Sequence, residues 1–162
     1  IYMMRVFILS FILSLNLTAE NSIEALEETL YAFWEARNNQ DFEMIFFFES
    51  KVGAITGSSS ENYFFEDPPP DLKSVVDYYS LVESDVKPSN IKIIQLSEEV
   101  YLTLYYLTGS YKYSNGKVNT EYKTRASNIW FYEDGGFKLY YKNFTNLKKE
   151  LEPTDIIAYP MD

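Results

Sequence analysis

The sequence predicts an α+β domain, a cone-shaped roll in which three N-terminal helices pack in a strongly curved antiparallel sheet. Two observations favour this class. Apolar residues recur mainly at helical spacing in the first half of the chain, and after Pro88 they alternate with polar residues in long runs that end at glycine turns. The 162 residues suit a single domain, and the 15 Tyr and 12 Phe predict a core built from large rings.

The first residues have the pattern of a secretory signal. One positive charge at Arg5 precedes an apolar run from Val6 to Leu17 and the small residue Ala19. The run is shorter than the roughly 20 residues that a membrane-spanning helix needs. A cleaved signal over residues 1–19 is therefore predicted, with a retained anchor as the alternative. We expect an exported protein, periplasmic or secreted, without membrane contact after cleavage.

Three helices are expected before the sheet. Helical spacing over residues 23–37 predicts an amphipathic first helix, and Asn21 with Glu24 has the side chains of a capping box. Asp41 is expected to cap a short second helix that is apolar almost all round and therefore buried. A third helix is expected over residues 71–82, with its apolar residues on one side.

The remaining elements are predicted to be strands. Residues 52–65 suit a short hairpin, and the consecutive prolines within residues 66–71 predict a stiff connector. Strand-like runs from residue 90 to residue 147 predict a long antiparallel meander. Its turns are expected at residues 114–116 and 134–136, because Asn and Gly tolerate the left-handed backbone that hairpin turns require.

The last hairpin, residues 124–145, decides which side chains face the hollow of the cone. A three-residue turn would pair Ile129 with Tyr141 and place alternate residues of both strands on one face. Lys138 and Lys142 fall on the other face, which predicts that this other face is in water. The predicted pocket residues are Tyr31, Trp34, Arg125, Ser127, Ile129, Tyr141 and Asn143. The predicted partner surface is an outer aromatic stripe of Trp130, Tyr132 and Tyr140.

Arg125 is the most informative residue of the predicted inner face, because a partly buried guanidinium needs a carboxylate, carbonyl oxygens or a ligand anion. An internal salt bridge to Glu27, Glu35 or Glu121 is the alternative to ligand recognition. The polar residues of that face would either orient a small ligand or satisfy one another around a filled core.

Charge and composition exclude several classes of function. The chain has 14 basic and 24 acidic residues and a formal net charge of −10, so neither nucleic acid nor an anionic membrane surface is an expected partner. It has no Cys and no His, which excludes disulfides, thiol nucleophiles, Ser-His-Asp triads and imidazole bases. The sequence holds no metal-ligand cluster, and no cofactor is expected.

Both ends of the predicted domain resemble a known family. The stretch LYAFWEARNNQDFEMIFFF, residues 30–48, is similar to the opening helices of nuclear transport factor two-like proteins. The stretch TRASNIWFYEDGGFKLYYKNFT, residues 124–145, is similar to their last two strands. The resemblance covers about residues 22–147 and is closest to the SnoaL-like branch and to the association domain of calcium/calmodulin-dependent kinase. It implies a cone domain over residues 20–147, a tail over residues 148–162, and a homodimer.

Two histidines that related sequences carry on the last strand are absent. Their His-x-His-x-Ser pattern corresponds here to Tyr141, Asn143 and Thr145. The resemblance therefore implies that any activity relying on a pocket imidazole is missing. We expect an exported, non-catalytic SnoaL-like domain that binds a small, partly apolar ligand in its cone and pairs as a homodimer.

Two alternatives remain open. One is an enzyme of the isomerase or cyclase type, in which Glu121 or Asp77 abstracts a proton and a Tyr hydroxyl or Arg125 stabilises the oxyanion. Tyr141 is the expected hydroxyl donor. The other is a purely assembling module that uses the outer aromatic stripe for protein contacts.

Overall fold

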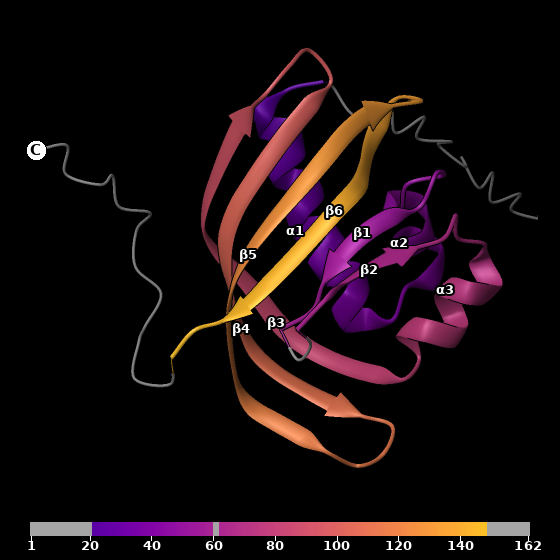
Figure 1. Cartoon of the computed structure of the whole chain (residues 1–162), viewed down its shortest axis with the longest axis vertical. Coiled ribbons are helices and arrows are strands. Elements are labelled where there is room, and N and C mark those ends of the chain that lie inside the picture. The colour runs from indigo at the N-terminus through magenta and orange to yellow at the C-terminus, as the bar shows by residue number, and fades with distance from the viewer. Residues whose placement is uncertain (1–20, 60–61, 149–162) are drawn as a thin grey trace, which may run out of the picture.

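A computed structural model describes residues 21–59 and 62–148 of the chain (Figure 1). In these residues three helices and six strands follow in the order α1, α2, β1, β2, α3 and β3 to β6. The predicted signal, residues 1–19, lies outside the described residues, as does all of the predicted tail except Lys148. The division of the chain into a signal, a domain and a tail therefore stays a prediction.

The first helix, α1 (Ile23–Asn39), lies along the concave side of the sheet (Figure 1). It begins after Ser22, whose hydroxyl accepts a hydrogen bond from the N–H of Ala25. The cap predicted at Asn21 is therefore wrong, and the Asn21 amide oxygen instead accepts a hydrogen bond from the Tyr101 hydroxyl at 2.8 Å. The side chains that α1 contributes to the main core are Leu26, Leu30, Phe33 and Trp34.

Two shorter helices, α2 (Phe42–Phe48) and α3 (Leu72–Tyr79), pack against each other at one end of the sheet (Figure 1). Asp41 and Asp71 cap their first turns, as the sequence predicts. The expectation that α2 is buried all round is wrong, because only two of its seven residues are buried. None of the helices in residues 21–59 and 62–148 is both long and apolar enough to cross a membrane.

The strands form one curved sheet in the order β2-β1-β6-β5-β4-β3 (Figure 1). They are β1 (Ala54–Gly57), β2 (Phe64–Asp67), β3 (Val82–Gln95), β4 (Val100–Tyr113), β5 (Val118–Glu133) and β6 (Gly136–Asn146). The α+β class and the curved sheet are confirmed. The prediction of a wholly antiparallel sheet is wrong, because β1 runs parallel to β6. The third helix also ends earlier than predicted, since β3 begins at Val82.

The hairpin between β5 and β6 differs from the prediction at its turn. The turn holds two residues, Asp134 and Gly135, rather than three, and both have positive φ. The pairing of Ile129 with Tyr141 is nevertheless as predicted, because Tyr140 is an extra residue that forms a bulge in β6. The bulge changes which side each later residue of β6 faces.

The two faces of β5 are the reverse of those predicted. The even-numbered residues between 122 and 130 are buried, whereas Arg125 is exposed. The charged residues of the strand all lie on the odd-numbered face: Glu121, Lys123, Arg125 and Glu133. Hydration of these charges therefore favours the observed orientation. Trp130 faces the core, with its ring edge-on to Phe33 at 5.9 Å and its Nε1–H donating to the Thr103 hydroxyl at 3.1 Å.

Candidate ligand-binding cavity

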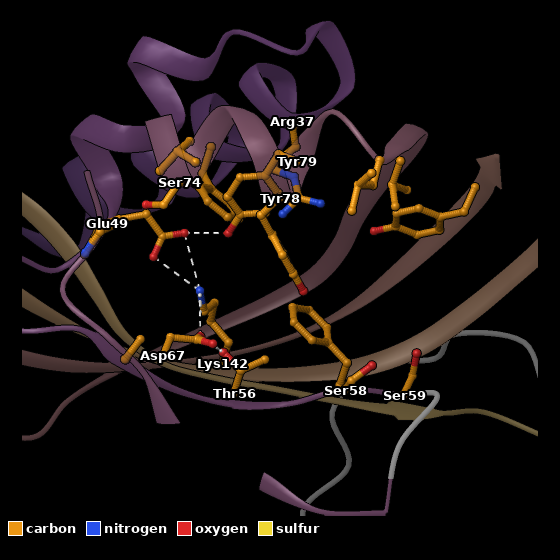
Figure 2. Close-up of a pocket in the computed structure, with 18 of the residues that line it drawn as sticks. Arg37, Glu49, Thr56, Ser58, Ser59, Asp67, Ser74, Tyr78, Tyr79 and Lys142 are labelled. Carbon is orange, nitrogen blue, oxygen red and sulfur yellow. Dashed lines mark hydrogen bonds and ion pairs between the residues drawn. The ribbon is translucent and has the colours of Figure 1, made fainter. Parts of the chain in front are cut away.

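A cavity of about 440 Å³ lies between the helices and the concave face of the sheet (Figure 2). Side chains from α1, from α3 and from all six strands line it. Its volume falls within the range of roughly 300–1,000 Å³ that is typical of small-molecule sites. One end of the cavity carries charged groups, and several aromatic rings line its walls.

The charged end is built around Lys142 (Figure 2). Its Nζ lies 3.2 and 3.3 Å from the two carboxylate oxygens of Glu49 and 3.5 Å from Oδ2 of Asp67. The Tyr79 hydroxyl donates to Oε1 of Glu49 at 2.6 Å, and the Thr56 hydroxyl donates to Asp67. The buried charges are thus paired and hydrogen-bonded, as a poorly hydrated interior requires.

Local structure brings these groups together from distant parts of the chain. Glu49 directly follows α2, where the backbone is extended and forms a parallel bridge with Leu139. The bulge in β6 allows Leu139 and Lys142, three residues apart, to be buried on the same side. Tyr79 is the last residue of α3, and Asp67 is the last residue of β2. The cluster therefore joins the helical end of the domain to the sheet.

Burial and neighbouring charges act in opposite directions on Lys142. Burial lowers the pKa of its ammonium, but Tyr79 and the two carboxylates together outweigh burial and hold the pKa above its ordinary value. Lys142 is therefore a protonated structural cation and not an amine nucleophile. Burial, with a smaller contribution from Glu49, raises the pKa of Tyr79 to about 12, although Lys142 opposes the shift. The Tyr79 hydroxyl thus stays a neutral donor.

The stability of the domain at high pH should depend on its buried tyrosine hydroxyls. Burial raises the pKa of four tyrosines, namely Tyr79, Tyr105, Tyr111 and Tyr122. The folded domain therefore keeps protons that the unfolded chain releases near pH 10, and its stability should fall as the pH rises from about 10 to 12. Each such group contributes a slope of up to about 1.4 kcal/mol per pH unit. The raised pKa of Lys142 acts in the same direction above the ordinary lysine pKa.

Urea unfolding at several values of pH measures this loss, and ultraviolet absorbance of tyrosinate follows the ionisation itself. Stability that is unchanged between about pH 9 and pH 12, or ionisation of the four buried tyrosines near pH 10 in the folded domain, would contradict the prediction.

Aromatic rings line a large part of the cavity. Trp34 donates its Nε1–H to the Tyr105 hydroxyl at 3.1 Å, and its ring lies edge-on to Phe144 at 6.0 Å. The rings of Tyr111 and Tyr122 meet at 4.5 Å. These contacts position flat apolar surfaces around the open volume, which suits a ligand that is itself partly apolar.

Arg37 lies in the last turn of α1 and reaches the cavity beside Tyr79 (Figure 2). Its Cζ is 3.9 Å from the centroid of the Tyr79 ring and 5.9 Å from that of Trp34. Both distances are those of cation–π contacts. The Tyr79 ring thus contacts Arg37 through its face, while its hydroxyl contacts Glu49 at the charged end.

Of the predicted pocket residues, Trp34 lines the cavity. The other six do not: Tyr31, Arg125, Ser127, Ile129, Tyr141 and Asn143. Tyr31 is 48% exposed on the solvent side of α1, and the five strand residues lie on the convex face because the strands face the other way. The same orientation directs Arg125 away from the helix acids Glu27 and Glu35, so the predicted internal salt bridge to either of them is wrong.

The predicted partner stripe is corrected for the same reason. Trp130 has no exposed surface and belongs to the core. Tyr132 turns inward, and its ring packs at 5.2 Å against Phe137. Tyr140 alone keeps an outer position, where its ring lies 5.1 Å from that of Phe131. The three residues do not form one surface.

The carboxylates that face the cavity are Glu49 and Asp67, which the sequence analysis did not select. The bases suggested for the enzyme alternative lie elsewhere, with Glu121 exposed and Asp77 paired with Lys73 on the solvent side of α3. One signal was present in the sequence, since Glu49 directly follows a run of three phenylalanines. In the part of the chain that the structure describes, no group of three or more Cys, His, Asp or Glu side chains could hold a metal ion.

Comparison with solved structures identifies the architecture as the nuclear transport factor 2-like (NTF2-like) fold. An NTF2-like protein from Cytophaga hutchinsonii superposes with a TM-score of 0.62 at 16% identity, covering 79% of this chain and 100% of that one. A candidate Ca/calmodulin-dependent kinase II association domain from Exiguobacterium sibiricum gives 0.61 at 12% identity, covering 80% and 97%. A ketosteroid isomerase-like protein from Erwinia carotovora atroseptica gives 0.58 at 13% identity, covering 75% and 93%.

These likenesses concern the fold. They confirm, at that level, the resemblance to nuclear transport factor two-like proteins that the first helices and the last hairpin predict. No family model matches the sequence, and no curated protein sequence is significantly similar to it.

Proposed function

We propose that this chain is an exported, non-catalytic domain of the NTF2-like fold that binds a small, partly apolar molecule in its cone cavity. The observation that carries the proposal is an open volume of about 440 Å³ with aromatic walls and a paired charge cluster at one end. A cone filled by its own side chains would instead suit a purely structural domain. The proposal of export rests on the sequence of residues 1–19 alone.

Binding without chemistry agrees with the state of the polar groups. Both carboxylate oxygens of Glu49 accept hydrogen bonds from Lys142, and one also accepts from Tyr79. The carboxylate is therefore already engaged within the protein, and Lys142 stays protonated. These groups support the fold and the polarity of the cavity, and none of them is left in the form that a nucleophile needs.

One observation favours an enzyme of the isomerase type as a second candidate. A carboxylate and a tyrosine hydroxyl share one cavity in a fold that a ketosteroid isomerase-like protein also has. Proton exchange at the carbon beside the carbonyl of 2-tetralone, followed by NMR in D₂O, tests this candidate. Exchange that the protein accelerates and that Glu49→Gln abolishes would support the enzyme and contradict the non-catalytic proposal.

We also propose that the domain pairs as a homodimer through the convex face of the sheet. Partly buried apolar side chains gather there on β4, β5 and β6: Leu102, Leu104, Tyr106, Ile129, Phe131 and Tyr141. Contiguous apolar surface of this kind commonly marks a partner surface. Sedimentation over a range of concentrations measures the state, and a strict monomer would contradict the pairing.

Filling the cavity should weaken binding. Val82 lines the cavity on β3, and Val82→Phe would place an aromatic ring in the open volume. We expect the unmodified domain to bind the neutral fluorescent probe N-phenyl-1-naphthylamine, and the variant to bind it at least about tenfold more weakly, the equivalent of about 1.4 kcal/mol of lost contact. Val118→Phe, at an exposed position of β5, is the matched control and should bind normally. Equal binding by the two variants, or none by the unmodified domain, would contradict the proposal.

A further inference from the structure

We infer that the cavity binds a small carboxylate with an aromatic body and that Arg37 recognises its charge. The inference deepens the proposed function and rests on it. Among the described residues that line the cavity, four side chains are charged: Arg37, Glu49, Asp67 and Lys142. Both carboxylates form ion pairs with Lys142, whereas Arg37 forms no ion pair with any residue of the described ranges. Arg37 is therefore the cation that remains for an anion from outside.

Packing fixes the position of Arg37 without satisfying its hydrogen bonds. The faces of Tyr79 and Trp34 hold the guanidinium at 3.9 and 5.9 Å, but rings accept none of its five in-plane N–H groups. The residue is half-buried, so part of its hydration is lost. Figure 2 shows the guanidinium beside the Tyr79 ring and directed into the open cavity. A ligand oxygen there would meet donors that are already oriented.

A tyrosine hydroxyl of the same cavity can contribute to the site. Burial raises the pKa of Tyr111, although the positive charge of Arg37 opposes that shift, so the hydroxyl stays a neutral donor. Tyr111 lines the same cavity, and its hydroxyl forms no hydrogen bond to another residue that the structure describes. A bound carboxylate accepts two parallel N–H bonds from Arg37, and the Tyr111 hydroxyl is available to donate a third.

Charge and shape select a carboxylate over a phosphate. The charges of the two cations and two carboxylates that line the cavity sum to zero. A bound carboxylate would therefore add one negative charge and a phosphate dianion two, to a chain whose net charge is already −10. The planar fork of arginine matches the two oxygens of a carboxylate. Around the rest of the ligand, the rings of Phe33, Trp34 and Phe144 provide flat apolar walls for an aromatic body.

Phenylacetate and its neutral counterpart phenylacetamide test the inference, with Kd measured by calorimetry and by tryptophan fluorescence. The unmodified domain should bind phenylacetate about 10- to 100-fold more tightly than phenylacetamide. In Arg37→Met the preference should vanish, while phenylacetamide is bound as before. Arg125→Met changes an exposed arginine on the convex face, so this matched control should keep the preference.

N-phenyl-1-naphthylamine separates failure of the inference from failure of the proposed function, because this probe is neutral. If it binds while phenylacetate is bound no better than phenylacetamide, or if Arg37→Met keeps the preference, the inference is wrong and the proposed function stands. If neither this probe nor the two phenyl compounds bind, both are wrong. Arg37→Lys is a second variant to use if Arg37→Met does not fold. It keeps the positive charge but lacks the planar guanidinium, so it should retain only part of the preference for phenylacetate.

Discussion

Replacing Trp130 by alanine should lower the free energy of unfolding by about 3–5 kcal/mol. The side chain has no exposed surface and lies edge-on to Phe33 in the main core. Its removal leaves a cavity between α1 and the sheet, and it also leaves the buried Thr103 hydroxyl without its N–H donor. Urea unfolding followed by circular dichroism measures the change.

Tyr140→Ala is the control for this prediction. Tyr140 is also an aromatic residue of the final hairpin, but it lies at the bulge on the outer side and is 37% exposed. Its replacement should cost no more than about 1 kcal/mol. If Trp130 were instead part of an outer stripe, Trp130→Ala would change the sedimentation of the protein and leave its stability nearly unchanged.

Lys142→Met should also lower the free energy of unfolding by about 3–5 kcal/mol. The change removes the cation that Glu49 and Asp67 share. The Asp67 side chain is 43% exposed and can be hydrated, whereas that of Glu49 is only 7% exposed and would keep the Tyr79 hydroxyl as its remaining close donor. Most of the cost therefore comes from leaving one buried carboxylate without a counter-charge.

Removing both buried charges should restore much of this loss. The double variant Glu49→Leu/Lys142→Met carries no buried charge at either position. It should therefore be more stable than Lys142→Met alone. The exposed pair of Lys112 and Glu83, 3.1 Å apart, provides a matched surface control. Lys112→Met should change the stability by less than about 1 kcal/mol. Equal costs for the two lysine variants would show that the buried pair does not support the fold.

The elements of this fold could be predicted because each is specified by neighbouring residues. Asp41 and Asp71 provide side-chain caps directly before apolar helical segments, and the structure begins α2 and α3 there. Asp134 and Gly135 tolerate positive φ, so a hairpin turn was expected at the place where it occurs. Alternating aromatic and polar residues were sufficient to predict the long strands.

The facing of the strands could not be obtained in this way, because it depends on contacts between distant segments. Lysine is normally found in water, and that rule placed Lys142 outside. It fails here because Glu49, 93 residues earlier in the chain, meets the ammonium inside the cone, together with Asp67. A stronger signal was the gathering of all charges of β5 on one face, with Arg125 among them. Arg37 gave no signal beyond its helical spacing.

The bulge at Tyr140 has a consequence for anyone who aligns this chain with others of the same fold. Tyr140 has no partner on β5, because Trp130 pairs with Leu139 and Ile129 pairs with Tyr141. After Tyr140, a residue of β6 therefore lies one position further along the sequence than its pairing with β5 would give in a strand without a bulge. A motif copied residue for residue onto Tyr141 and Asn143 therefore falls on the convex surface, whereas Lys142 and Phe144 occupy the lining. When the last strand of the other protein has no such bulge, a gap of one residue at Tyr140 is needed before the lining positions can be compared.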